Sequence, residues 1–143
     1  MEITNQSSQN TRILKKIAKT IAPNYLLPNQ VEVVFIDNEE NSLVAEGVSY
    51  DYHPDNPGLG YIIIAINKTN NYPKITQYWN ETPVVKLNSF EEEITLVLAH
   101  ELRHNDAQFL QWDYADEADE EMDAENFAIR VLQAYKKSLT VKG

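Results

Sequence analysis

The sequence predicts an α+β fold: a small, mainly three-stranded sheet with an N-terminal helix, followed by two further helices. Apolar residues recur at helical spacing near both ends of the chain, and short β-branched runs between turn-forming residues occupy the middle. The 143 residues, 43% of them hydrophobic, can bury one core but are too few for two ordinary domains. We therefore expect a single domain over residues 1–143, with the polar residues 1–9 disordered.

The first element is expected to be a helix from about Asn10 to Ala22. Pro23 ends its pattern, because proline cannot continue a helix. Apolar residues recur at helical spacing within it: Ile13, Leu14, Ile17 and Ile21. This spacing places them on one face, which we expect to pack against the rest of the protein.

Three strands are expected to follow, over residues 31–36, 43–50 and 61–67. The first, VEVVFI, is rich in β-branched residues and is bounded by turn-forming ones, and we expect it to pair with the second as a hairpin. The third, YIIIAIN, is the most apolar. The segments 53–60 and 70–83 are rich in residues that break regular structure and are expected to be irregular.

Two helices complete the predicted fold, the first from Phe90 onward and the second running to about Ser138. Ser89 and Glu92 can form a capping box at the start of the first helix. Apolar residues at helical spacing mark its buried side: Ile94, Val97, Leu98, Leu102 and Phe109. The last helix has a comparable stripe: Ala124, Phe127, Ala128, Val131, Leu132 and Tyr135.

The composition argues against several classes of function. Twelve Lys and Arg against 22 Asp and Glu give a formal charge of −10, which disfavours nucleic acid or an anionic membrane as a partner. There is no cysteine, so a bound metal would have nitrogen and oxygen ligands. The polar start shows no signal peptide, and no apolar run is long enough to span a bilayer. We therefore expect a soluble, cytoplasmic protein.

The first of the two C-terminal helices contains a motif with metal chemistry, His100-Glu101-Leu102-Arg103-His104. Residues four apart lie on one face of a helix, so the two imidazoles can bind the same ion. Glu101 would lie beside that ion, where a carboxylate can take the proton of a metal-bound water. The alternative is a surface helix with solvated side chains. The motif follows an apolar run, EITLVLA, where burying these groups without a function would be costly.

Zinc sites usually have three protein ligands, so a third is expected from the acidic segment that follows. This segment offers seven candidates: Asp116, Glu117, Asp119, Glu120, Glu121, Asp123 and Glu125. The apolar stripe of the last helix extends backward to Glu121 and, one turn earlier, to Glu117. Glu121 is therefore the preferred ligand, with Glu120 and Glu117 as alternatives. Glu125 could accept a hydrogen bond from an imidazole N–H behind the metal.

The two motifs together resemble those of the gluzincin clan of zinc peptidases. In that clan, HExxH on one helix is completed by the glutamate of a Glu-x-x-Ala-x-x-Phe-Ala type segment on the next, and here residues 121–128 read EMDAENFA. The nearest likeness is to short ImmA/IrrE-type metallopeptidases of bacteria, phages and mobile elements and to minimal single-domain gluzincins. The resemblance implies a minimal zincin-like fold, Glu101 as the general base, and Zn²⁺ ligated by His100, His104 and Glu121.

Two features of the sequence differ from what related HExxH families have at the same positions. ImmA/IrrE-type proteins commonly have Gly before the second His of the motif, where this chain has Arg103, so the subfamily is left open. Residues 46–49 (EGVS) faintly resemble the segment that brings a cysteine to the metal in peptide deformylases. Val48 stands at that cysteine position, and the chain has no cysteine, so deformylase chemistry is disfavoured.

Three further features are weaker candidates. His53 could stabilise an oxyanion, although a histidine in such a loop is more often exposed. Tyr114 follows the motif helix, where a phenol could reach a reaction intermediate. The strand over residues 61–66 could bind an extended substrate as an edge strand, or it could be a buried central strand.

These features favour a zinc-dependent metallopeptidase-type hydrolase that uses a metal-activated water, with Glu101 as general base, in a narrow regulatory or processing role. Its partner would be a protein or peptide substrate. The alternative is a catalytically silent, zinc-stabilised interaction domain, such as a phage or mobile-element accessory protein. The sequence leaves the substrate and the oligomeric state open.

Overall fold

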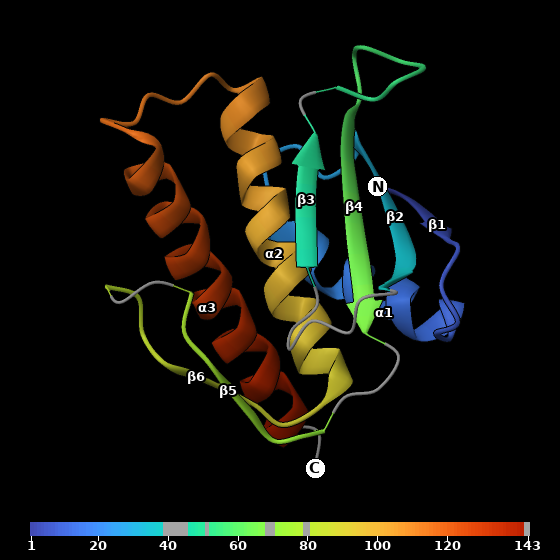
Figure 1. Ribbon diagram of the computed structural model, residues 1–143, viewed down its shortest axis with the longest axis vertical. Coiled ribbons are helices and arrows are strands. Elements are labelled where there is room, and N and C mark those ends of the chain that lie inside the picture. Colours follow the sequence, from blue (N-terminus) through green and yellow to red (C-terminus); the bar gives the residue numbers. More distant parts are fainter. Residues whose placement is uncertain (39–45, 51, 68–70, 79–80, 142–143) are drawn as a thin grey trace.

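The computed structural model describes residues 1–38, 46–50, 52–67, 71–78 and 81–141. It confirms the predicted α+β class, with a small sheet, an N-terminal helix and two long C-terminal helices (Figure 1). Within these residues, four strands form one sheet and two short strands form another. No described helix has an apolar stretch that would cross a bilayer.

The main sheet has the strand order β1-β2-β4-β3 and combines parallel and antiparallel pairs. β1 (Glu2–Asn5), β2 (Val31–Asn38) and β4 (Gly60–Asn67) run parallel, and β3 (Glu46–Tyr50) runs antiparallel to β4. Buried and half-buried residues alternate along most of β4, as expected for a strand with one face on the core. Because β4 lies between β2 and β3, it is a central strand, and β3 forms one edge of the sheet.

The structure differs from the sequence prediction in how the main sheet is completed. Residues 1–9 are predicted to be disordered, whereas Glu2–Asn5 form β1; its backbone pairs with β2, and Ile3 packs against the core. A polar composition does not reveal such backbone pairing. The predicted hairpin between the first two strands is wrong, because β3 pairs with β4 and the apolar β2 is flanked by β1 and β4. Residues 43–45 of the second predicted strand lie outside the described residues.

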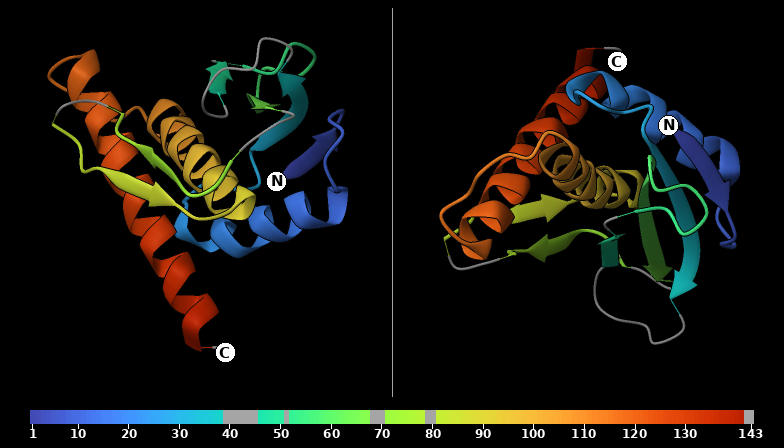
Figure 2. Two further views of the ribbon diagram at one scale, coloured as in Figure 1. Left: turned by 60° about the horizontal axis from the view of Figure 1, so that its bottom comes forward. Right: turned by 90° about the horizontal axis from the view of Figure 1, so that it is seen from above.

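A two-stranded sheet forms from the segment 70–83, which the sequence predicts to be irregular, and from the residues just after it. β5 (Lys74–Thr76) pairs antiparallel with β6 (Val85–Leu87), and the pair lies beside α3 (Figures 1 and 2). The residues of β6 alternate between buried and exposed, but a strand of three residues is too short for this period to be recognised in the sequence. Residues 70, 79 and 80 of the segment predicted to be irregular lie outside the described residues.

The described α-helices are close to the predicted ones: α1 (Thr11–Ile21), α2 (Phe90–Phe109) and α3 (Glu117–Val141). Asn10 caps α1, because its side chain accepts hydrogen bonds from two backbone N–H groups of the first turn. Ser89 caps α2 as predicted, with its hydroxyl accepting from the Glu92 N–H at 3.2 Å. α3 begins earlier than its apolar stripe, so most of the acidic segment is helical.

α2 is the central helix of the molecule. It lies between the main sheet and α3, and α1 packs on the same face of the sheet near β1 and β2 (Figures 1 and 2). The core fills the space between the sheet and these helices, and its most deeply buried residues are 0–1% exposed: Leu14, Phe35, Ile62, Ile64, Leu98 and Leu102. One side of α2 is therefore committed to the core, and the other faces α3.

Candidate metal centre

The two histidines of the motif lie one turn apart on the side of α2 that faces α3. Their ring centroids are 4.8 Å apart, and their Nε2 atoms are separated by 3.1 Å. Leu98 and Leu102 of the same helix are buried in the core. Core packing therefore fixes the rotation of α2 and turns both imidazoles toward α3.

Glu121 joins the histidines from the first turns of α3. Its Oε2 lies 3.1 Å from His100 Nε2, and its Oε1 lies 3.1 Å from His104 Nε2. One ligand atom from each of the three side chains lies within 4.8 Å of the other two, so the group could hold a metal ion. Glu120 instead lies 3.8 Å from His104 Nδ1, and Glu117 is not part of the group. Glu121 is thus the acid with ligand geometry.

Glu125 supports His100 from behind. Its Oε2 lies 2.9 Å from His100 Nδ1, and the side chain is buried. A carboxylate in this position holds the proton on Nδ1 and leaves the Nε2 lone pair free to bind a metal. The sequence predicts this supporting position for Glu125, and the structure brings the two groups together.

The groups that converge here favour a cation at their centre. Burial opposes protonation of His100, but hydrogen bonds to Glu121 and Glu125 outweigh it and raise the pKa of His100 to about 9. Burial also opposes protonation of His104. The hydrogen bond to Glu121 and the negative charge of that carboxylate outweigh the effect of burial, so the pKa of His104 is raised as well. Hydrogen bonds from the imidazoles of His100 and His104 hold the pKa of the Glu121 carboxyl far below its usual range, and the bond from His100 has the larger effect. Protonation brings positive charge to this group of carboxylates and imidazoles, and a bound divalent cation would bring the same kind of charge.

Glu101 is next to His100 in the chain and is 7% exposed. Burial raises the pKa of its carboxyl, although the imidazoles of His100 and His104 act in the opposite direction. A carboxyl group with increased proton affinity is better matched to accepting and returning protons near neutral pH. Its surroundings therefore fit the role of general base.

The other two candidate side chains make contacts elsewhere. His53 Nε2 is hydrogen-bonded to the Glu32 carboxylate, and its ring packs edge-on against Tyr61 at 4.9 Å. Tyr114 donates its hydroxyl to Asp123 Oδ2 at 2.7 Å. Neither contact involves His100, His104 or Glu121, so the structure gives no support for a role of His53 or Tyr114 at this candidate site.

A residue that the sequence does not indicate lies at the site instead. Tyr78, from the segment between β5 and β6, donates its hydroxyl to Glu121 Oε2 at 2.8 Å, and its ring centroid lies 5.0 Å from that of His100. Forty-three positions separate Tyr78 from Glu121, and no local pattern marks it. Only the folding of the β5–β6 pair beside α3 brings it to the ligands.

Arg103 links the two helices next to the ligands. Its guanidinium binds Asp123 through two hydrogen bonds of 3.0 and 3.3 Å. The same group lies over the rings of Trp112 and Phe127, at 4.4 and 4.2 Å from their centroids. Arg103 therefore connects α2 to α3 and to the segment between them, immediately before His104 in the chain.

The end of α2 is also fixed to the rest of the protein. Asp106, 1% exposed, accepts hydrogen bonds from the backbone N–H groups of Leu26 and Leu27 at 2.9 and 3.0 Å. Asn105 packs so closely on Gly60 that a Cβ there would lie 1.9 Å from its Oδ1. These contacts hold the histidine-bearing turns in place relative to the sheet.

No family model, curated protein or solved structure matches this chain. The convergence of His100, His104 and Glu121 is therefore the main support for a metal centre.

Proposed function

We propose that this protein is a zinc-dependent metallopeptidase-type hydrolase of the gluzincin kind. The observation that carries the proposal is that two imidazoles and the Glu121 carboxylate converge while the buried Glu101 lies beside them. Two nitrogen donors and one carboxylate oxygen, with no cysteine in the chain, form a donor set that zinc uses in catalytic sites. The likeness to short ImmA/IrrE-type metallopeptidases points the same way.

His100, His104 and Glu121 would hold the zinc ion. When bound, zinc would supply Lewis-acid chemistry, polarising a carbonyl and making water acidic enough to act near neutral pH. Glu101 takes a proton from the attacking water and returns it to the leaving amine. Glu125 keeps His100 oriented through Nδ1, so the ring does not have to reorganise during turnover.

The main sheet offers a way to bind an extended peptide. β3 is the edge strand nearest α2, and its outer backbone groups can pair with an added strand. For β4 the sequence left two alternatives open, an edge strand that binds substrate and a buried central strand, and β4 is in the interior of the sheet. We therefore assign peptide binding to β3. A protein or peptide substrate, a cytoplasmic location and a narrow processing role complete the proposal.

The substitution Glu101→Gln tests this function. The variant should retain zinc, because Glu101 is not a ligand, and should lose about 100-fold to 10,000-fold of peptide hydrolysis, which is the usual contribution of general acid–base catalysis. The control variant Glu91→Gln makes the same chemical change in the first turn of α2, and it should retain both zinc binding and peptide hydrolysis. His100→Ala should lose zinc and activity together. Zinc content is measured by elemental analysis, and hydrolysis with a fluorogenic peptide library.

The outcomes separate the alternatives. Hydrolysis that persists in Glu101→Gln would contradict the assignment of the general base. Zinc stoichiometry that is unchanged in His100→Ala would contradict the metal site itself. A wild-type protein that binds zinc but cleaves no member of the library would favour the catalytically silent, zinc-stabilised interaction domain.

A further inference from the structure

The two imidazoles of the candidate metal centre have four ring nitrogens, and each of these has a carboxylate nearby. His100 lies 3.1 Å from Glu121 through Nε2 and 2.9 Å from Glu125 through Nδ1. His104 lies 3.1 Å from Glu121 through Nε2. The fourth nitrogen is Nδ1 of His104, and the nearest carboxylate among the described residues is that of Glu120, with Oε1 at 3.8 Å. Glu120 therefore has the same position relative to His104 that Glu125 has relative to His100.

His104 can bind a metal through Nε2 only if its ring proton is on Nδ1. A metal takes the lone pair of one ring nitrogen, and Nε2 is the nitrogen of His104 that faces His100 and Glu121. The remaining N–H is then on the side of the ring that faces Glu120. Ligating histidines almost always donate this N–H to a carboxylate, a carbonyl or water, which fixes the ring and makes the ligating nitrogen more basic.

Glu120 can reach this N–H. The distance of 3.8 Å is longer than a hydrogen bond, but the side chain is 36% exposed, so solvent surrounds it and leaves it room to rotate toward the ring. Its backbone N–H is fixed, because it donates to the Asp116 carbonyl at 3.3 Å. Within the part of the chain that the structure describes, Glu120 has no ion pair other than the one with His104.

Acidic residues in the first turn of a helix also have a general effect, because they interact favourably with the helix dipole. The first turn of α3 contains three of them: Glu117, Asp119 and Glu120. Among these, Glu120 is the residue with an ion pair to a candidate metal ligand. A role at His104 can therefore be separated from the general effect by comparing Glu120 with Glu117.

We propose that Glu120 is a positioning residue for His104: its carboxylate accepts the Nδ1–H of this ring when Nε2 binds zinc. The inference rests on the proposed function, because it gives Glu120 a role in the same metal centre. Consecutive residues of α3 then serve the same imidazole, with Glu121 beside Nε2 as a ligand and Glu120 beside Nδ1 as a support. Glu125 is 5% exposed, so the more exposed Glu120 should contribute less than Glu125 does.

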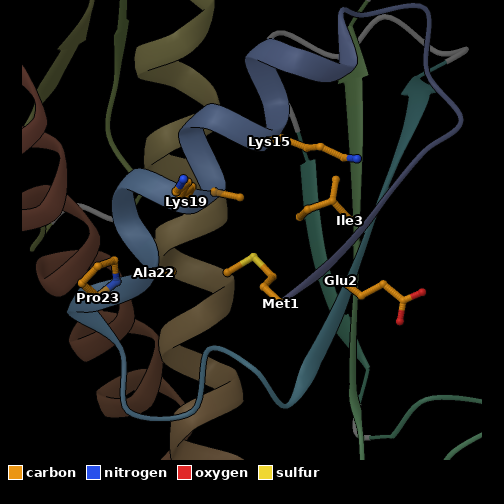
Figure 3. Close-up of a pocket in the computed structure, with 8 residues that line it drawn as sticks. Met1, Glu2, Ile3, Lys15, Lys19, Ala22 and Pro23 are labelled. Carbon is orange, nitrogen blue, oxygen red and sulfur yellow. The ribbon is translucent and has the colours of Figure 1, made fainter.

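Glu120→Ala tests the proposal in the full chain. Zinc affinity, measured by competition with a chromophoric chelator, should fall by about tenfold, the lower end of the usual range for partners of metal ligands, and the zinc stoichiometry should not change. Glu117→Ala removes the same charge from the same turn and should change affinity by no more than about twofold. Glu2→Ala is a second control with the same expectation, because Glu2 lies at the cavity between α1 and β1, away from α3 (Figures 1 and 3).

NMR of the histidine rings gives a second readout that a change in helix stability would not produce. In the zinc-loaded wild type, the Nδ1–H of His104 should be protected from exchange with water by its hydrogen bond to Glu120. In Glu120→Ala, this protection should be lost. The Nδ1–H of His100 should remain protected in both proteins, because its partner is Glu125.

The possible results separate this inference from the proposed function. Equal affinities in Glu120→Ala and Glu117→Ala, or an unchanged Nδ1–H of His104 in Glu120→Ala, would overturn the inference and leave the proposed function intact. A reduced zinc stoichiometry in Glu120→Ala would also overturn it, because Glu120 would then be a ligand. Zinc binding that persists unchanged in His104→Ala would instead contradict the metal centre and the proposed function with it.

Discussion

The two oxygens of Glu121 have different neighbours. Oε2 is near His100 Nε2 and also accepts the Tyr78 hydroxyl, whereas Oε1 is near His104 Nε2. A hydrogen bond from a phenol to one carboxylate oxygen restricts rotation of the group and orients the other oxygen. In the proposed metal centre, Tyr78 would therefore be a positioning residue for Glu121, in the same way that Glu125 positions His100.

Tyr78→Phe tests this positioning role. It removes the hydroxyl and keeps the ring beside His100, so we expect zinc affinity to fall by about tenfold to 100-fold, as is usual for partners of metal ligands. Tyr72→Phe is the matched control, because Tyr72 also donates to a glutamate, Glu93, at 2.7 Å but away from the ligands. Competition with a chromophoric chelator measures both affinities. Equal affinities in the two variants would show that Tyr78 does not orient Glu121.

At the scale of elements, the site depends on the alignment of α2 and α3. The candidate ligands come from both helices, so a shift of one helix along the other would separate Glu121 from the histidines. Arg103 opposes such a shift, because it binds Asp123 of α3 in a bidentate manner and stacks on Phe127 of the same helix. Asp123 also accepts the Tyr114 hydroxyl, which ties the intervening segment to this contact.

Arg103→Lys should weaken this link without removing the charge. Lysine lacks the planar fork that binds Asp123 and stacks between aromatic rings, so we expect a loss of about 1–2 kcal/mol in unfolding free energy and a lower zinc affinity. Arg130→Lys is the control, because Arg130 also lies over Phe127, at 5.4 Å from the ring centroid, whereas the two hydrogen bonds to Asp123 come from Arg103. Urea unfolding and zinc competition measure the two effects. Similar losses in both variants would rule out a special role for Arg103.

The limits of the sequence prediction also follow from these elements. α1, α2 and α3 are predictable because their apolar residues repeat over many turns, and the two histidines because their spacing is local. Glu121 can be selected as the third candidate ligand by extending the apolar stripe of α3 backward by one turn. β1, the strand pairing and Tyr78 depend on contacts between distant parts of the chain, and a short polar or irregular segment gives no sign of them.

At the scale of the whole molecule, α2 connects the sheet to the candidate metal centre. One side of the helix is in the core, and the other presents the two candidate histidine ligands to α3. Ligands on two packed helices are held more rigidly than ligands on loops, which favours a preorganised site.

The tyrosines give the whole molecule a predictable response to alkaline pH. Burial is the main cause that raises the pKa of five of them above the ordinary value, and nearby carboxylates add to it: Tyr25, Tyr72, Tyr78, Tyr114 and Tyr135. Above about pH 10 the folded protein therefore retains protons that the unfolded chain has released. The stabilisation is complete below about pH 10 and is lost as the pH rises further.

We therefore expect the urea midpoint to fall steadily between about pH 9.5 and about pH 11.5 at constant ionic strength. Tyr25→Phe should reduce the slope of this fall, because Tyr25 is 6% exposed and donates its hydroxyl to the Ala99 carbonyl at 2.9 Å. Below about pH 10 the same variant should be less stable by about 1 kcal/mol, the usual contribution of such a hydrogen bond. The urea midpoint of Tyr25→Phe should approach that of the wild type as the pH increases. A wild-type midpoint that stays constant over this range, or an unchanged slope in Tyr25→Phe, would show that tyrosine ionisation is not linked to unfolding.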